Sequence, residues 1–290
     1  MADIFSPSRL GGTSQAVALA SACLSILLVL YLMFFADLYR RPDATESQVA
    51  QTLEGRPPLD IHIEMMSLDP IRQTVEARLN FPERRADAAQ AGGARVRLSD
   101  GGFVRELHLP ADRAAGATSV EFGLDGSISA YPFDVYRTDA LIAAFAGEGA
   151  QEAPLAVQLT VWERLPAWEA RVVSRPARPG EVGLPISIEA RRPPAHVVFA
   201  LIVYAVMAVI AVCGLAIGVL AACGVRKIEA AFASSLAGML FAAPMLRNAM
   251  PGAPPLGVAA DAYVFLWVQV ALMIGLVLFI CAWARRGSPP

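Results

Sequence analysis

The sequence predicts a membrane protein with four transmembrane α-helices and an extracytoplasmic all-β sandwich domain. Two observations predict this fold class. Hydrophobic residues make up 56% of the chain and charged residues only 17%, and four long segments contain almost no charge, which is typical of a membrane protein. Between the first and the second segment, apolar and polar residues alternate with the period of two that is typical of β-strands.

Each apolar segment is long enough to cross a bilayer, since about 20 helical residues span a hydrocarbon core of about 30 Å. The predicted transmembrane helices are residues 16–36, 197–223, 229–248 and 261–284. The third is the most polar, because Ser234, Ser235, Gly238 and Pro244 interrupt it. We interpret the first as an uncleaved anchor, because its apolar run exceeds the roughly 7–15 residues of a signal peptide.

The positive-inside rule predicts the orientation. Four helices place both termini on one side, and the short segments of that side carry Arg9, Arg226, Lys227, Arg285 and Arg286. The short loop of the other side, residues 249–260, has only Arg247 beside it. We therefore expect a multi-pass protein of the plasma membrane, with residues 1–15 and 285–290 in the cytoplasm and the large domain outside.

Alternating runs predict strands throughout residues 58–192. The clearest are residues 59–65 and 70–81, and shorter runs follow at residues 96–98, 107–109, 120–124, 155–161 and 186–190. Seven or eight short strands separated by turn signals predict a β-sandwich. Only residues 138–145 hint at a helical period. The polar residues 37–57 are predicted to link the first helix to the domain.

Charge and cysteine content narrow the partners of this domain. Residues 37–195 contain 18 Arg and 23 Asp or Glu, a net charge of −5 (18 − 23), which argues against a nucleic-acid-binding surface. The domain has no cysteine and must be held by its own core. We expect the lipid bilayer as one partner, and a second copy or another envelope protein as the other.

Established catalytic motifs are absent from the sequence, among them the phosphate-binding Gly-Lys loop and the metalloprotease His-Glu-x-x-His. Asp60, His62 and Glu64 project from one face of a predicted strand. They could hold a divalent metal or form a solvated polar face. We predict no enzymatic activity, no cofactor and no metal, and an enzyme built on these three residues is the third alternative.

Two groups of residues are candidates for coupling the domain to the helices. In the domain they are the loop Tyr131-Pro132-Phe133-Asp134, which either is clamped by aromatic packing or touches the helices, and the basic strand end Arg191-Arg192. Beside the outer loop they are Arg247 and Asp261. These two charges either pair, meet the domain, or extend separately to the interface.

Small residues at four-residue spacing predict close approach of helices. Gly214 and Gly218 form such a pattern in the second predicted helix, and Ser234 and Gly238 form one in the third. Contacts of this kind occur within one subunit or between subunits.

The chain resembles the domain of unknown function 4436 family. The residues that carry the likeness lie between about 55 and 285: Tyr131-Pro132-Phe133-Asp134, Arg191-Arg192-Pro193, Arg247-Asn248, Pro251-Gly252, Pro254-Pro255, Gly257, Asp261 and Trp267. The resemblance implies a bacterial membrane protein with one helix before the domain and three after it. It implies no activity, because the family has none assigned.

A fainter likeness connects the chain to pentameric ligand-gated ion channels. Their β-sandwich also carries an aromatic-Pro-Phe-Asp loop, which in them meets the membrane domain and couples it to ligand binding. This chain departs from them in its extra N-terminal helix, in having three helices after the domain instead of four, and in lacking cysteines around the loop.

These observations predict a non-enzymatic envelope protein whose outer β-domain binds a partner or organises a complex. The alternative is a subunit of an oligomeric ligand-responsive channel. A pore usually needs a polar or charged ring, for which the third helix offers Ser234 and Ser235, with Glu229 at its inner end.

Overall fold

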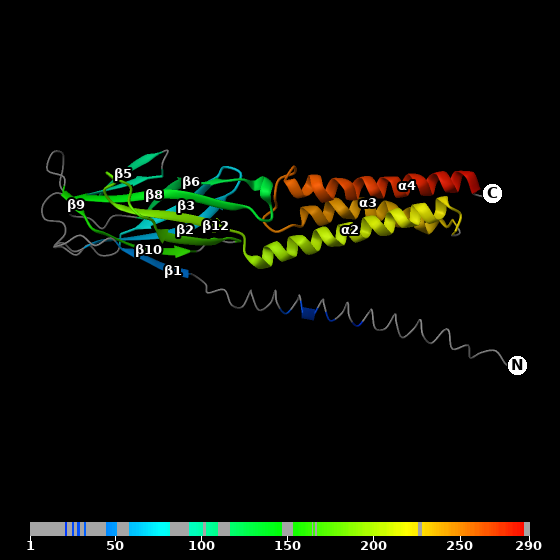
Figure 1. Ribbon diagram of the computed structural model, residues 1–290, viewed down its shortest axis with the longest axis horizontal. Helices are drawn as coiled ribbons and strands as arrows, with labels where there is room; N and C mark the ends of the chain where they lie inside the picture. Colours follow the sequence, from blue (N-terminus) through cyan, green and yellow to red (C-terminus); the bar gives the residue numbers. More distant parts are fainter. Residues whose placement is uncertain are drawn as a thin grey trace. The chain divides into compact units, whose positions relative to one another are not determined.

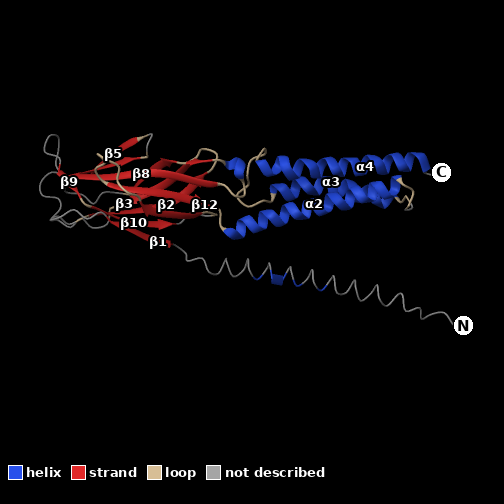
Figure 2. Ribbon diagram, viewed as in Figure 1, coloured by secondary structure: helices blue, strands red, loops and turns tan. Residues whose placement is uncertain are grey.

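A computed structural model describes residues 45–50, 58–81, 93–100, 103–109, 117–146, 153–163, 165, 167–225 and 228–286, and a few separate positions between 21 and 32. Apart from those positions, the predicted first transmembrane helix, residues 16–36, lies outside the described residues, as do residues 1–15. The described part contains a β-domain and three long helices (Figures 1 and 2).

One sheet of the β-domain has five strands in the order β1-β10-β2-β3-β6. Their bounds are β1 Thr45–Ala50, β10 Val157–Glu163, β2 Leu59–Asp69, β3 Thr74–Asn80 and β6 Thr118–Gly123. All neighbours are antiparallel except β10 and β2, which run parallel.

The second sheet has seven strands, with the path β11-β12-β8-β4-β5 and two short strands beside β8. Their bounds are β11 Glu169–Ser174, β12 Leu184–Arg191, β8 Val135–Ala146, β4 Ala94–Ser99, β5 Val104–Leu109, β7 Asp125–Gly126 and β9 Ala153–Leu155. All pairs are antiparallel. β12 leads directly into the helices.

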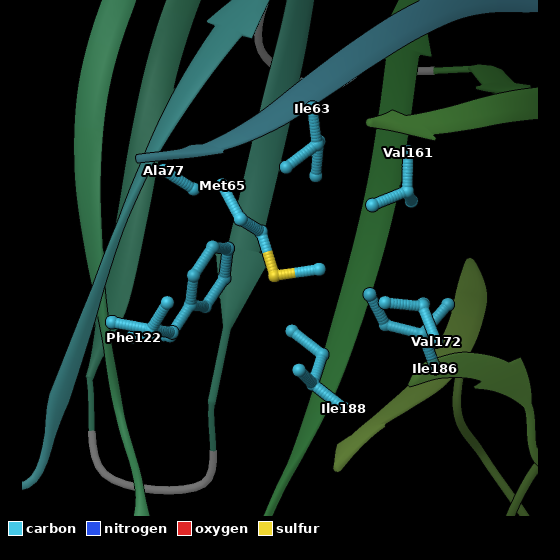
Figure 3. A pocket seen from close by; sticks show the side chains of 9 residues that line it. Ile63, Met65, Ala77, Phe122, Val161, Val172, Ile186 and Ile188 are labelled. Atoms are coloured by element: carbon cyan, nitrogen blue, oxygen red, sulfur yellow. The ribbon is translucent and has the colours of Figure 1, made fainter. Parts of the chain in front are cut away.

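The two sheets share one apolar core, as a sandwich requires. Ile61 and Leu79 of the first sheet and Ile142 of the second are each 0% exposed, so the strand alternation read from the sequence does mark the buried face. Figure 3 shows the centre of this core, where Ile63 and Met65 face Ile188 across a cavity of about 10 Å³. Its lining is entirely apolar and it has room for about one water molecule at most, so it is a packing gap rather than a ligand site.

Three expectations about the β-domain need correction. Residues 45–50, predicted as linker, form β1, because an edge strand is held by backbone pairing with β10 and needs no apolar alternation. Residues 138–145 belong to β8, in which burial alternates as far as Ile142 and only residues 142–144 are buried consecutively, so the hint of a helical period was wrong. The run 70–81 is broken by a turn that leaves Ile71 69% exposed.

Three helices are long and apolar enough to cross a membrane. They are α2 (Pro194–Ala222), α3 (Ala230–Asn248) and α4 (Leu266–Arg286), the last preceded by the π-helical turn η4 (Asp261–Phe265). These positions agree with the predicted helices after the domain. α2 begins with Pro194, a residue suited to a first helical turn because the missing N–H would have no helical partner there.

The backbones of α2 and α4 touch at glycines. A Cβ atom on Gly218 would overlap the backbone of Gly275, and one on Gly214 would lie 2.5 Å from Leu272 Cδ2. Ser234 and Gly238 differ, because both are exposed and nothing lies within 4 Å of a Cβ on Gly238. In the described part of the chain nothing approaches Gly238, so a close helix contact at Ser234 and Gly238, within the subunit or between subunits, stays a prediction.

We expect Gly218→Ala to lower the thermal stability of the detergent-solubilised chain and Gly238→Ala not to lower it. Both changes gain about 1 kcal/mol of helix propensity. Only the methyl group at position 218 must push α2 away from α4, and such overpacking costs about 1–3 kcal/mol. Unfolding followed by circular dichroism gives the two midpoints, and equal shifts would contradict the close α2–α4 contact.

Candidate coupling site between the β-domain and the helices

A buried ion pair lies where β12 leads into α2. Arg192 Nε donates to Asp134 Oδ1 at 2.6 Å, and Arg192 Nη2 donates to Asp134 Oδ2 at 2.9 Å. The two side chains are only 2% and 0% exposed. Burial makes either charge costly unless the other satisfies it, and the two parallel hydrogen bonds do so.

The strand register brings this pair together. Arg192 follows the last residue of β12, and Asp134 precedes the first residue of β8. The two strands are antiparallel with Arg191 opposite Val135, so the residues just beyond these ends meet although they are 58 positions apart. Their encounter therefore depends on the correct pairing of β8 with β12.

Aromatic rings enclose the guanidinium group. Arg192 Cζ lies 4.6 Å from the centre of the Tyr131 ring and 4.5 Å from that of Trp168. Ring faces attract a cation, especially one removed from water. Tyr136 packs edge-on against Trp168 with ring centres 5.3 Å apart. Burial, and then the Asp134 carboxylate, raise the pKa of Tyr136.

Tyr131 connects the ion pair to the outer loop that joins α3 to η4. Burial raises the pKa of Tyr131 to about 12, so its hydroxyl stays protonated. The hydroxyl Oη donates a hydrogen bond to the carbonyl oxygen of Pro251, at an O–O distance of 3.1 Å. The next residue, Gly252, has φ +75°, and a Cβ atom there would overlap Arg192 Nη1. A glycine is needed because the loop backbone lies against the guanidinium group.

Local hydrogen bonds hold the Tyr131 loop in place. The 3-10 turn η2 (Ile128–Ala130) precedes it, and Ser127 Oγ accepts from Ser129 N at 3.3 Å. Phe133 N donates to Ala130 O at 2.8 Å. The loop is thus built by its own short-range contacts, and it directs Tyr131 inward while Phe133 stays 65% exposed.

A second buried ion pair closes the outer loop itself. Arg247 donates from Nε to Asp261 Oδ1 at 3.0 Å and from Nη2 to Oδ2 at 2.6 Å. Arg247 also donates to the carbonyl oxygens of Pro254 and Pro255, each at 2.7 Å. Among the alternatives predicted for the two charges, the structure shows that they pair.

An apolar cluster continues from the domain into the helices. Tyr131 packs in one buried group with Tyr204 and Met207 of α2, Met250 of the outer loop and Val268 of α4. This group is separate from the core between the two sheets. The Tyr131 loop therefore belongs, by its packing, to the helical part of the molecule.

The predicted coupling residues fall into two sets. Tyr131, Asp134, Arg192, Arg247 and Asp261 are buried and take part in the contacts above. Arg191 does not, since it is exposed and its Nε donates to Glu169 Oε2 at 3.3 Å. Asp134 binds Arg192 and not Arg247, because β8 and β12 bring those two residues together.

Trp168 is a site residue that the sequence did not indicate. It precedes β11 without any motif around it, and only the folded chain places it on Arg192. At Asp60, His62 and Glu64, the His62 ring packs against Trp162 with ring centres 5.0 Å apart. Within the part of the chain that the structure describes, no group of three His, Cys, Asp or Glu side chains could hold a metal ion.

A separate, charged groove lies on the outer face of the seven-stranded sheet. Its volume is about 690 Å³ and its lining includes Arg137, Asp139, Arg175, Arg178 and Glu181. Arg175 donates to both carboxylate oxygens of Glu181, at 2.9 and 2.8 Å. This contact, with a hydrogen bond from Arg178 N, lowers the pKa of Glu181 to about 2. The groove therefore carries both signs of charge at neutral pH.

We expect Asp134→Ala to destabilise the full chain strongly. It leaves Arg192 buried without its partner, a loss of about 3–5 kcal/mol. The matched control Glu189→Ala removes the exposed carboxylate that binds Arg137 on the same sheet, a contact worth about 0–1 kcal/mol. Urea unfolding followed by tryptophan fluorescence gives both values.

A double variant, Asp134→Ala with Arg192→Met, should be more stable than Asp134→Ala alone, because no unpaired charge is then buried. If Asp134→Ala costs no more than Glu189→Ala, the ion pair does not hold the junction.

Two family models match the chain. Residues 49–188 match the domain of unknown function 4436, and residues 192–286 match the domain of unknown function 8686. A search of curated proteins found no match. The likeness read from residues 55–285 thus divides between two families, and the second match begins at Arg192, the partner of Asp134 in the first. The β-domain of this chain is thus similar to the domain of unknown function 4436 family over residues 49–188.

Proposed function

We propose that this chain is a non-enzymatic integral protein of the plasma membrane whose helices hold the β-domain in one orientation outside the membrane, where the domain binds a partner. The observation that carries the proposal is the buried junction around Arg192. A domain that needed only an anchor could be attached by a flexible linker. Here a buried ion pair, two aromatic rings and a hydrogen bond to the outer loop join the two parts.

The proposed membrane part comprises four helices, with residues 16–36 as the first span beside α2, α3 and α4. The orientation rests on the distribution of positive charge. Arg247 is the one basic residue at the outer short loop, and it is neutralised by Asp261 in a buried pair. One basic residue beside the outer short loop, against five in the short segments of the other side, favours cytoplasmic termini.

The charged groove on the seven-stranded sheet is the proposed partner-binding surface. It lies on a rigid sheet, and Arg178 extends into solvent with 67% of its side chain exposed. Charges of both signs favour a protein segment that also carries both, since such a segment can complement each. Another envelope protein fits this chemistry better than a nucleic acid, given the net negative charge of the domain.

The orientation predicts which single cysteines an impermeant thiol reagent reaches in intact cells. In a variant with all four native cysteines replaced by alanine, Val182→Cys should react at once, because residue 182 is 53% exposed on the β-domain. Val225→Cys, between α2 and α3 and 66% exposed, should react only after the membrane is permeabilised. The reverse pattern would place the domain in the cytoplasm.

A photoreactive amino acid at position 178 should yield one discrete adduct with a second protein in native membranes. The same probe at Arg78, exposed on the five-stranded sheet, is the control and should yield none. Equal adducts at both positions would show that the groove has no special role. Adducts of the chain with itself, together with a pentameric native mass, would instead support a channel.

The second candidate function is a subunit of an oligomeric ligand-responsive channel, and the contact between Tyr131 and Pro251 supports it. The Tyr131–Asp134 loop touches the outer ends of the helices through Tyr131 and Pro251, where the likeness to ligand-gated channels implies a coupling loop. An oligomer of that kind would require α3 to line the axis with its exposed Ser234 and Ser235. A monomeric native mass in detergent would remove this candidate.

A further inference from the structure

Two exposed apolar side chains lie at the end of the β-domain from which α2 emerges. One is Phe133, 65% exposed, next to the buried Asp134. The other is Ile71, 69% exposed, in the turn between β2 and β3. Exposure of an apolar side chain to water at a loop tip is unfavourable, and covering it would lower the free energy.

The sheet registers place both tips at the same end. β8 starts at Val135 opposite Arg191, which is the end of β12 that continues into α2. β7 pairs with the first residues of β8, so β6, which ends at Gly123 just before β7, also ends there. Gly123 is opposite Thr74, the start of β3, which brings the preceding turn to this end. Figure 1 shows the cyan turns of this region at the end of the β-domain that faces the helices.

The turn is built so that Ile71 stays outward. Asp69 Oδ1 accepts from the backbone N–H groups of Ile71 and Arg72, at 2.8 and 3.0 Å. Gln73 Nε2 donates to Gly126 O at 2.6 Å, and Gln73 O accepts from Leu124 N at 2.7 Å. These bonds tie the turn to the neighbouring strands, so Ile71 is held at the tip by a fixed backbone. Arg72 beside it has 79% of its side chain exposed, and its Nε lies 3.8 Å from Asp69 Oδ2, a loose surface pair that leaves the guanidinium group open to a further partner.

The helical part also exposes large apolar and aromatic side chains, in and after the outer loop. Tyr263 and Trp267, four residues apart at the start of α4, are 79% and 64% exposed, and Leu256 of the outer loop is 75% exposed. Exposed tyrosine and tryptophan at a helix end are typical of the headgroup region of a bilayer. The outer membrane boundary is therefore expected beside the outer loop, against which Tyr131 and Arg192 pack.

We propose that Ile71 and Phe133 rest in the headgroup boundary of the outer leaflet, with Arg72 bound to a lipid phosphate. This surface, the Ile71/Phe133 tips, is the lipid contact of the β-domain itself, distinct from its helical anchor. The inference rests on the proposed function, since it requires the helices to span the membrane. Phospholipid is the occupant because the Tyr131 loop contacts the outer loop at Pro251, and Tyr263 and Trp267, which follow this loop, are exposed aromatics of the kind that mark the bilayer boundary. At the bilayer boundary the composition changes with depth from hydrocarbon to phosphate. An exposed apolar side chain can contact the hydrocarbon there while an adjacent arginine binds the phosphate.

The test uses the full chain in phosphatidylcholine vesicles, in the variant that lacks native cysteines. Nitroxide labels are attached singly at Ile71→Cys, Phe133→Cys, Val182→Cys and Val277→Cys. Power saturation compares collisions with oxygen, which concentrates in lipid, and with a water-soluble nickel chelate. Val182 precedes β12 at the end remote from α2, about 25 Å away along the strand, and serves as the exposed apolar control. Val277 of α4, 57% exposed, reports on the span itself.

We expect the labels at positions 71 and 133 to be several-fold less accessible to nickel than the label at 182, with a ratio of oxygen to nickel accessibility between those of the labels at 182 and 277. If 277 is lipid-accessible but 71 and 133 behave like 182, the tip contact is wrong and the membrane placement stands. If 277 is itself open to nickel, the proposed span fails, and the tip contact fails with it. Dipolar broadening between labels at 71 in separate chains would show that a second copy, not lipid, covers the tips.

Discussion

The Arg192–Asp134 ion pair is the interaction on which the arrangement of the two parts depends. An arginine removed from water is unfavourable by several kcal/mol unless its environment compensates. Here the carboxylate provides two hydrogen bonds and the Tyr131 and Trp168 rings provide two electron-rich faces. The compensation exists only when β8, β12 and the turn before β11 have all assembled. The pair therefore favours one arrangement over its alternatives rather than simply adding stability.

The Arg192–Asp134 pair joins the two regions of the chain that match different family models. Asp134 lies in the region that matches the domain of unknown function 4436, and Arg192 is the first residue of the region that matches the domain of unknown function 8686. The apolar cluster around Tyr131 crosses the same boundary. A β-domain separated from the helices would expose both the Asp134 carboxylate and the Tyr131 ring. The two regions are distinct in sequence and joined in packing.

Much of the fold could be predicted from the sequence, because burial acts on local patterns. Residues such as Val75 and Leu79 alternate because one face of β3 is buried. Charge is absent from α2 and is confined in α4 to Arg285 and Arg286 of the last turn. The coupling residues were found for a related reason, since charges and prolines beside apolar segments are unusual. The contacts between residues that are far apart in the sequence could not be predicted. Asp134 and Arg192 are 58 residues apart and meet through strand register, and Trp168 has no local signal at all. Likewise Gly218 and Gly238 look equivalent in sequence, and only the helix arrangement buries one and exposes the other.

The connection between β12 and α2 is only two residues long, Arg192 and Pro193. Proline restricts its own backbone to a narrow range of φ, and Arg192 is fixed by its ion pair, so neither residue offers slack. Mechanically, β12 and α2 behave as one rigid element. A force applied to the far end of the seven-stranded sheet is therefore transmitted along β12 to the first turn of α2, because no flexible linker lies between them. A molecule bound to the β-domain would thereby act on α2 through this two-residue connection.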